Sequence, residues 1–341
     1  MTSDPLVDLN RLDSWMRDNV VNFTGPISVA KIEGGQSNPT FRLDTPSKSY
    51  VLRRKPAGQL LKSAHAVDRE FRVQSALAQT DVPTAHMHAL CQDPDVLGAD
   101  FYVMDYIKGR SFDDPRMPSL DPKERREIMT DMNLALAKIH SVDLFKVGLE
   151  DYGPKGHYVE RQVTRWTAQY RATETETVRD MDDLMDWLSN NMIPDDGQRT
   201  LVHGDYRIDN LLYDPTQPKI LAILDWELST LGHPFADLAS VIMQWQMPAG
   251  GDGRGLAGVD RANLGLMTDQ EFVDLYCANR DIPAVENFSF YLAFCFFRMA
   301  AILQGVKKRA LDGNASDPGR GLTLGEYVPL FARMGLKAAT Q

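Results

Sequence analysis

The chain has 341 residues, of which 43% are hydrophobic and 25% are charged, and its formal net charge at pH 7 is −10. This length is enough for two domains with separate cores, and the composition is typical of a globular protein. Nucleic-acid-binding proteins normally present a basic surface, because phosphate contacts supply most of their affinity, so the acidic balance argues against a nucleic-acid partner. The same balance weakly favours a neutral or cationic small-molecule ligand.

The cysteines and the apolar segments predict the compartment. Three cysteines occur, Cys91, Cys277 and Cys295, without a CxxC pair, so no disulfide framework is expected. Residues 1–16 have acids where a signal peptide has bases. The apolar stretch 288–306 contains Arg298 and Gln304, which predicts a buried helix instead of a membrane span. We therefore expect a cytoplasmic protein without a membrane partner.

The first hundred residues read mainly as a small sheet with one helix. ISVAKIE, TFRLDT and SYVLRR, within residues 27–55, have strand composition and are separated by the turn-rich segments GGQSNP and TPSK. The pattern of residues 64–79 predicts a helix. Two further strands are predicted after it, at VPTAHMHAL (82–90) and DFYVMDYI (100–107). A small mixed lobe is therefore predicted at about residues 25–106.

After Gly109 the sequence becomes mainly helical. Asp121, Pro122 and Glu124 form a helix-start signature of an acidic N-cap, a proline at N1 and a glutamate at N3. Apolar residues then recur at helical spacing between Ile128 and Ile139. Two short strands are expected in the remainder, at 211–214 and 220–227. A strand-rich lobe followed by a helical lobe predicts a ligand cleft between them.

The strongest chemical signal is the segment LVHGDYRIDN at residues 201–210, followed by the apolar strand ILAILDWE. Phosphoryl transfer needs a carboxylate that orients the acceptor hydroxyl and oxygen ligands that hold magnesium on the phosphates. Asp205 and Asn210 have the D-x4-N spacing of a kinase catalytic loop. Asp225, at the end of the apolar strand, is placed to supply a second hard oxygen ligand, of the kind that suits Mg²⁺.

These motifs, together with GHPFADLA at 232–239, resemble the aminoglycoside phosphotransferase and choline-kinase-like superfamily. More narrowly, they resemble the kinase-like domain fused to some acyl-CoA dehydrogenases, and the resemblance spans about residues 27 to 300. It implies that Asp205 is the catalytic base and that Asn210 and Asp225 bind Mg²⁺. It also implies that His203 shapes the catalytic loop, and that Asp237, at a helix start, braces this loop.

The loop at residues 33–41 offers a candidate phosphate-binding segment. Glycines let backbone amides approach phosphate oxygens, and serine or asparagine side chains add donors. An ordinary hairpin loop explains the same composition. The candidate nucleotide-binding residues here are Gly34, Gly35, Ser37 and Asn38.

The strand SYVLRR adds a candidate phosphate-binding cation. Val51 and Arg53 share one strand face, so Val51 could line the adenine pocket while Arg53 meets the phosphates. Protein kinases use lysine at this place, and Arg54 and Lys55 leave open which cation reaches in, or whether all three lie in solvent. Glu70 in the following helix could pair with Arg53, as the matching residues do in kinases.

The family pattern also implies the hinge. The strand that begins at Phe101 would end there, with backbone groups of Asp105 and Ile107 bonded to adenine and Met104 behind the ring.

The Walker motif GxxxxGK[ST] and the esterase motif GxSxG are both absent, which argues against a P-loop ATPase and a serine hydrolase. The acidic run at residues 180–183 reads as a solvated helix face, with a cationic acceptor site as the minority interpretation.

Together these features predict an α+β, protein-kinase-like fold of two lobes. Residues 1–106 would form the nucleotide-binding lobe with an N-terminal helix, and residues 107–341 the catalytic and acceptor-binding lobe. The predicted reaction moves the γ-phosphoryl group of ATP, with Mg²⁺, to a hydroxyl of a small molecule, such as a hydroxyacyl or acyl-CoA-type metabolite. The alternatives are a choline- or homoserine-kinase-like enzyme and a nucleotide-binding pseudokinase. Residues 150–195 and 245–330 are the expected acceptor region, and the sequence leaves the oligomeric state open.

Overall fold

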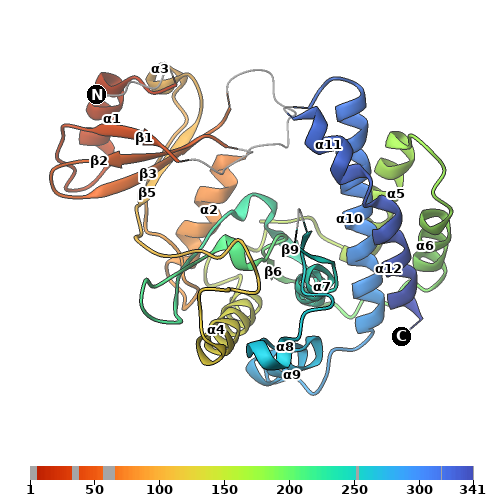
Figure 1. The fold of residues 1–341 in the computed structure, drawn as a ribbon. Helices are drawn as coiled ribbons and strands as arrows, with labels where there is room; N and C mark the ends of the chain where they lie inside the picture. The colour runs from red at the N-terminus through yellow and green to blue at the C-terminus, as the bar shows by residue number, and fades with distance from the viewer. Residues whose placement is uncertain (1–5, 33–37, 57–65, 251–252, 316, 341) are drawn as a thin grey trace. The chain divides into compact units, whose positions relative to one another are not determined.

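The structure is a computed structural model that describes residues 6–32, 38–56, 66–250, 253–315 and 317–340 (Figure 1). The chain forms two compact units. The first consists of residues 1–112, 142–150 and 208–229, and the second of residues 113–141, 151–207 and 230–341. The sequence suggested one boundary between residues 106 and 107, whereas two later segments return to the first unit. Each unit is described by itself.

The first unit is built on a five-stranded antiparallel sheet with strand order β1-β2-β3-β5-β4. Its elements are α1 (Leu9–Asn19), β1 (Ser28–Lys31), β2 (Thr40–Asp44), β3 (Ser49–Arg54), α2 (Val67–Leu77), β4 (Met87–Cys91), α3 (Pro94–Leu97), β5 (Phe101–Asp105), the 3₁₀ turn η1 (Ile208–Asn210), β7 (Leu211–Tyr213), β8 (Ile220–Ile223) and the 3₁₀ turn η2 (Trp226–Leu228). The strands expected within residues 27–55 and the helix after them are confirmed.

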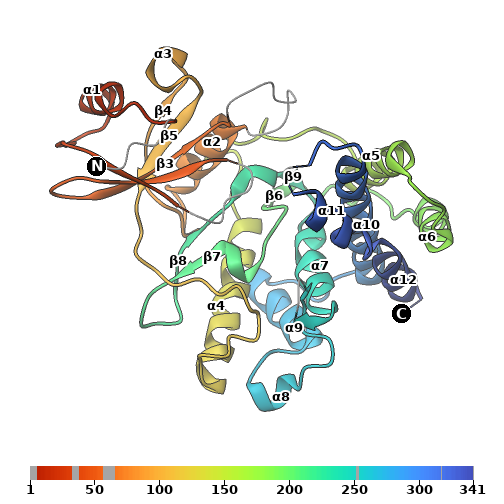
Figure 2. The same cartoon turned by 45° about the horizontal axis from the view of Figure 1, so that its top comes forward.

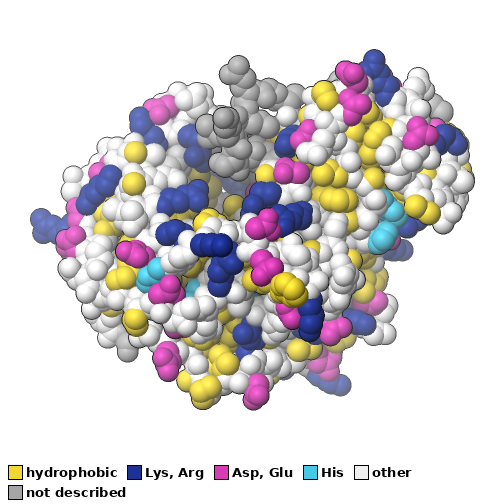
Figure 3. All heavy atoms as spheres, turned by 180° about the vertical axis from the view of Figure 1, so that it is seen from behind, with side chains coloured by type: hydrophobic (Ala, Val, Ile, Leu, Met, Phe, Trp, Pro, Cys, Tyr) yellow, Lys and Arg dark blue, Asp and Glu magenta, His cyan; other side chains and the backbone are white. Residues whose placement is uncertain are grey.

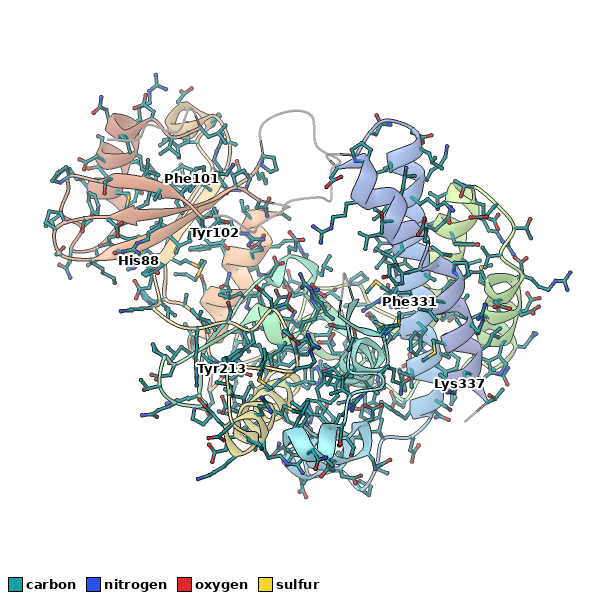
Figure 4. All side chains as sticks on the ribbon, in the orientation of Figure 1. His88, Phe101, Tyr102, Tyr213, Phe331 and Lys337 are labelled. Carbon is teal, nitrogen blue, oxygen red and sulfur yellow. The ribbon has the colours of Figure 1, made fainter. Side chains whose placement is uncertain are left out.

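Alternating side chains on β3 and β5 separate two cores on opposite sides of the sheet. Leu52 and Phe101 belong to the larger cluster, which also contains Leu12 and Met16 of α1. Tyr102 lies in the smaller cluster, with Val67 of α2. Figure 2 shows α1 and α2 beside the sheet, and Figure 4 labels Phe101 and Tyr102 on β5. The face toward α2 is therefore the one that carries Val51, Arg53 and their neighbours.

Two strands are shorter than the sequence suggested. Of residues 82–90, only the part from Met87 onward is in a strand, and the backbone carbonyl of Pro83 instead accepts a hydrogen bond from the N–H of Ile223. The strand expected at 220–227 ends at Ile223, because Asp225 adopts a left-handed backbone conformation that stops the ladder.

The second unit is mainly helical. Its elements are α4 (Pro122–His140), α5 (Tyr158–Thr173), α6 (Arg179–Asn190), β6 (Thr200–Val202), β9 (Thr230–Gly232), α7 (Pro234–Trp245), β10 (Ala249–Gly250), β11 (Gly253–Arg254), α8 (Arg261–Leu264), α9 (Asp269–Arg280), α10 (Phe288–Leu311), α11 (Pro318–Gly325) and α12 (Val328–Ala339). Asp121 caps α4 by accepting a hydrogen bond from the N–H of Glu124, as its sequence predicted.

Helix α10 is the central helix of the second unit, and α5, α6, α7, α11 and α12 pack against it (Figure 1). Among the described residues it is the one helix whose length and apolar composition match a membrane span, and 78% of its most apolar window is buried by the protein. The expectation of a buried helix at residues 288–306 is therefore confirmed.

Candidate active site

The hairpin β7–β8 of the first unit brings two predicted metal ligands to the same end. Leu211 pairs with Ile223 across the antiparallel ladder, and the N–H of Leu224 donates to the carbonyl of Asn210 at 2.8 Å. Asn210 therefore precedes one strand at the point where Asp225 follows the other. Residues 15 positions apart in the sequence become neighbours because a tight antiparallel hairpin matches its two ends.

Asp225 has φ 63° and ψ 59°, in the left-handed region that non-glycine residues adopt uncommonly. Aspartate tolerates this conformation better than most side chains. The turn η2 follows at once, with Trp226 buried and its Nε1–H donating to the carbonyl of Ile223 at 2.8 Å. Uncommon backbone conformations of this kind cluster at functional positions.

Arg53 is the centre of an ion-pair network on the α2 side of the sheet. Its guanidinium lies 3.0 Å from Glu70, 2.8 Å from Asp225 and 3.5 Å from Glu227, measured between the nearest nitrogen and carboxylate oxygen. The Arg53 side chain is 14% exposed and that of Glu70 only 1%. The predicted pair of Arg53 with Glu70 is thus present, and the strand register explains it because Arg53 faces α2.

Glu70 is a buried carboxyl whose oxygens accept hydrogen bonds from two neutral donors. The amide of Asn38 donates at 2.9 Å and the hydroxyl of Tyr102 at 3.0 Å. Burial raises the pKa of Glu70 to about 7, although Arg53 and the Tyr102 hydroxyl act to lower it. Burial acts to lower the pKa of Arg53, but the charges of Glu70 and Asp225 raise it above its ordinary value, so Arg53 stays a cation.

We expect Glu70 to make stability depend on pH. Its pKa is about 7 in the folded protein and near 4.5 in an unfolded chain, so the folded state binds the proton more tightly between these values. The contribution of Glu70 to the free energy of unfolding therefore falls as pH rises from about 4.5 to about 7, by up to ~3 kcal/mol. Chemical denaturation of the parent and of Glu70→Gln at several pH values measures this.

The stability of the parent relative to Glu70→Gln should decline as pH rises through that window. Glu286→Gln, at an exposed position of the second unit, is the matched control and should leave the pH dependence unchanged. A difference between parent and Glu70→Gln that stays constant from pH 5 to pH 8 would contradict the assignment.

The remaining nucleotide-binding candidates of the first unit lie on the same sheet. Val51 is 6% exposed and pairs with Met104 across β3 and β5, as an adenine-lining pair requires. The N–H of Asp105 donates to the carbonyl of His86, so an adenine contact of Asp105 would go through its own carbonyl. Its carboxylate contacts Lys48 and His88. The backbone of Ile107 follows the end of β5 and is partly exposed.

Arg54 and Lys55, which the sequence left as alternatives to Arg53, point elsewhere. Arg54 is 3% exposed and donates to the carbonyl of Leu97 at 2.7 Å, on the face opposite Arg53. Lys55 pairs with Asp100 at 2.6 Å. The alternative that all three cations lie in solvent is wrong for Arg53 and Arg54. Of the loop candidates, Asn38 is buried, whereas Gly34, Gly35 and Ser37 lie outside the described residues.

In the second unit, Asp237 of α7 fixes the segment that contains His203 and Asp205. Its carboxylate accepts the N–H of His203 at 2.6 Å and the N–H of Gly204 at 2.9 Å. Gly204 has φ 85°, which explains the glycine in the HGD motif. Burial alone would raise the pKa of Asp237, but hydrogen bonding to His140 and the charges of His140 and His203 lower it. Asp237 is therefore an ionised, structural acceptor.

His203 is a positioning residue. It is fully buried, and its Nδ1 accepts a hydrogen bond from the N–H of Asp205 at 3.3 Å. The Asp205 side chain is 27% exposed, and its carboxylate lies 3.1 Å from the Nε of Arg207. The carboxylate of Asp205 can therefore reach a ligand. The backbone N–H of Asp205 donates to His203, and the N–H groups of His203 and Gly204 donate to Asp237, so the backbone of this segment is held in place.

Three contributing residues were not predicted from the sequence. Glu227 joins the Arg53 network, and its place two residues after Asp225 was the available signal. Arg298 donates to the carbonyl of Gly204 at 3.4 Å from α10, and His140 lies 3.4 Å from Asp237. Only the tertiary structure brings these last two residues to the loop, because they lie far from it in the sequence.

The donor set fits magnesium that arrives with a nucleotide. In the described part of the chain, no three His, Cys, Asp or Glu side chains are arranged as a metal cage. Magnesium is usually held by one or two carboxylates together with substrate phosphates and water, and prefers hard oxygen donors. Asn210 and Asp225, at one end of the β7–β8 hairpin, offer one amide and one carboxylate oxygen.

The chain is similar to known proteins and to solved structures. Acyl-CoA dehydrogenase family member 10 of Mus musculus is 47% identical over 294 residues, which cover 86% of this chain and 27% of that protein. The chain thus spans about a quarter of the length of this curated relative. A crystal structure from Ralstonia eutropha, provisionally described as an aminoglycoside phosphotransferase, has a TM-score of 0.90 and 46% identity, with 98% of each chain covered.

A more distant structure shows the same fold. It is a thermostable mutant of an aminoglycoside phosphotransferase in ternary complex with AMP-PNP and hygromycin B, with a TM-score of 0.63, 14% identity and 96% and 98% of the two chains covered. The predicted protein-kinase-like fold, with a small antiparallel sheet and a helical part, is therefore confirmed. The model of the phosphotransferase enzyme family matches residues 28–287. The chain belongs to the phosphotransferase enzyme family.

Proposed function

We propose that this protein transfers the γ-phosphoryl group of ATP, with Mg²⁺, to a hydroxyl of a small molecule. The observation that carries the proposal is the segment from Asp205 to Asn210. It begins with the partly exposed carboxylate of Asp205 and ends at Asn210, which precedes β7 at the end of the hairpin where Asp225 follows β8. Phosphoryl transfer needs a carboxylate to orient the acceptor and oxygen ligands for magnesium, and these residues could supply both.

In the proposed reaction the acceptor oxygen attacks the γ-phosphorus and the bond from that phosphorus to the β,γ-bridging oxygen breaks. ADP leaves with the electron pair, and the hydroxyl proton passes to the Asp205 carboxylate. Asp205 orients the hydroxyl, and Asp237 and His203 keep its backbone in place. Arg53, held by Glu70, would contact the phosphates through its guanidinium. Bound magnesium would neutralise charge on the phosphates and would be held by Asn210 and Asp225.

Two findings support a nucleotide in particular. A structural neighbour was solved with AMP-PNP. In this chain, the Val51–Met104 pair and the Arg53 ion-pair network lie on one face of the sheet of the first unit. The intact set of Asp205, Asn210 and Asp225 argues against a pseudokinase, because each catalytic position carries a competent side chain.

For the acceptor, we propose a hydroxyacyl or acyl-CoA-type metabolite. The support is the 47% identity to a protein named as an acyl-CoA dehydrogenase family member. An amino sugar, the acceptor class suggested by the aminoglycoside phosphotransferase neighbours, is the competing choice. The fold itself is shared by both and does not decide between them.

ATP binding should require magnesium and Asp225. Isothermal titration of ATP is expected to give at least about tenfold weaker affinity when the metal is chelated, because triphosphate and carboxylate then repel each other. Asp225→Asn should show that weaker affinity even with magnesium present. Asp214→Asn, at the opposite end of the same hairpin, is the matched control and should bind like the parent. Equal affinity of the parent with and without metal would contradict the proposed magnesium site.

A further inference from the structure

We infer that Glu227 is a positioning residue for the proposed reaction: its carboxylate takes over the guanidinium of Arg53 from Asp225 when magnesium and ATP bind. The inference rests on the proposed function, because it takes Asp225 as a magnesium ligand and Arg53 as the cation that meets the phosphates. It assigns a role to a carboxylate for which the proposed reaction has no other use.

In the structure, Arg53 is held by the carboxylate that the metal would need. Its Nη2 donates a hydrogen bond to Oδ1 of Asp225 at 2.8 Å. Its Nε lies 3.0 Å from Glu70, close enough for an ion pair but not aligned for a hydrogen bond. Among the described residues, the guanidinium makes no other hydrogen bond than the one to Asp225. A divalent cation on Asp225 would compete with this bond and would repel the guanidinium, so Arg53 then needs another acceptor.

The carboxyl groups around Arg53 outnumber the cation. Glu70, Asp225 and Glu227 all lie within ion-pair distance of the one guanidinium. The face shown in Figure 3 carries Lys and Arg side chains interspersed with Asp and Glu, so a similar excess of acids is not general there. An added divalent cation would balance this local excess, and it would leave enough carboxylates for the arginine to keep a partner.

Glu70 is not able to follow the released end of Arg53, because its carboxyl group is fixed on its other side. The Glu70 side chain is 1% exposed, and its Oε1 accepts a hydrogen bond from the amide of Asn38 at 2.9 Å. Its Oε2 accepts from the hydroxyl of Tyr102, a residue of β5 labelled in Figure 4, at 3.0 Å. Glu70 therefore holds the Nε end of Arg53 in both states, and the acceptor for Nη2 must come from elsewhere.

Glu227 is placed to accept the released nitrogen. Its carboxylate lies 3.5 Å from the same Nη2 that donates to Asp225, whereas a charge-assisted hydrogen bond measures about 2.7–2.9 Å. A small movement closes that gap, and the side chain of Glu227 is 23% exposed and lies in η2, directly after Asp225. With Nε at Glu70 and Nη2 at Glu227, the guanidinium keeps its place and its Nη1 is left for a phosphate oxygen.

Two other roles for Glu227 are compatible with the same contact. It could be a further ligand of the metal, or it could support the turn η2 independently of Arg53. The first role is disfavoured, because in the described part of the chain no three His, Cys, Asp or Glu side chains are arranged as a metal cage. A double-mutant cycle separates the three roles, since only the inferred one acts through Arg53.

We would measure ATP affinity by calorimetry, at saturating magnesium and with the metal chelated. At saturating magnesium, Glu227→Gln should bind about tenfold more weakly than the parent, because Arg53 must then leave Asp225 without gaining a new charge-assisted hydrogen bond. With the metal chelated, the two proteins should bind ATP equally, since Arg53 stays on Asp225 in both. Asp18→Asn, at an exposed position of α1 on the opposite side of the sheet, is the matched control and should bind like the parent.

The cycle repeats the substitution in a protein that lacks Arg53. The background is Arg53→Gln together with Glu70→Gln, which removes both charges of the buried pair so that neither is left without its partner. In this background, Glu227→Gln should change the ATP affinity at saturating magnesium by less than about twofold. The comparison with and without metal uses Glu227→Gln alone, so it tests the inference independently of this background.

Three results would overturn the inference. Equal affinities of Glu227→Gln and the parent at saturating magnesium would mean that Arg53 stays on Asp225. Equal weakening with and without the metal would assign Glu227 a structural role, and a tenfold effect that persists in the background without Arg53 would make it a metal ligand. None of the three contradicts the proposed function, which uses only Asn210 and Asp225 for the metal. Failure of the parent to bind ATP with magnesium would contradict the proposed function, and the inference with it.

Discussion

Asp205→Asn should abolish most phosphoryl transfer while leaving ATP binding intact. The asparagine keeps the size of the side chain but cannot accept the hydroxyl proton, and a positioned general base contributes about 10²- to 10⁴-fold to a rate. The backbone of residue 205 is held by His203 and the side chain is partly exposed, so the loop should keep its shape. Turnover with an identified acceptor, at saturating ATP, should fall by that factor, and the calorimetric ATP affinity should stay close to that of the parent.

Asp209→Asn is the matched control for this change. Asp209 lies in the same loop, between Asp205 and the β7–β8 hairpin. Its variant should keep turnover within about threefold of the parent. If Asp205→Asn retained comparable turnover, or if Asp209→Asn lost more, the base would have to be a different residue.

Asp237→Ala should destabilise the second unit by about 3–5 kcal/mol, the usual cost when one partner of a buried charged network is removed. The carboxylate is 3% exposed and accepts the N–H groups of His203 and Gly204, which would both lose their acceptor. Asp237→Asn should also be destabilising, because its NH₂ group must face one of these donors. Denaturant unfolding measures both effects.

Asp186→Asn, an exposed position on α6 of the same unit, should change the free energy of unfolding by less than about 0.5 kcal/mol. An Asp237→Ala protein as stable as this control would show that the loop is held by other contacts, such as the bond from Arg298 to Gly204. Loss of activity without loss of stability would instead assign Asp237 a direct chemical role.

The sequence predicted the local elements well because they depend on short-range patterns. Strand-type composition indicated β2, β3 and β5, and the N-cap of α4 was readable from Asp121 and Pro122. The strand register of SYVLRR placed Arg53 on the face of Val51, and in the structure Arg53 contacts Glu70 whereas Arg54 lies on the opposite face. Period-two alternation fixes this because a shift of one residue would reverse every side chain.

Long-range partners could not be predicted in the same way. Nothing near Gly204 in the sequence indicates Arg298 of α10, and nothing near Asp237 indicates His140 of α4. The return of residues 208–229 to the first unit was missed for the same reason, since the bridge of Arg110 with Tyr213 joins residues about a hundred positions apart.

The most direct test of the proposed phosphotransferase is to follow the γ-phosphoryl group itself. ATP labelled with ³²P at the γ position would be incubated with the protein, magnesium and a defined set of hydroxyl-containing metabolites that includes hydroxy acids, and the labelled products would be separated. The proposal predicts a labelled small molecule whose formation needs magnesium and is lost in Asp205→Asn. Label that remains in ATP, or that appears as inorganic phosphate equally with parent and Asp205→Asn, would contradict it.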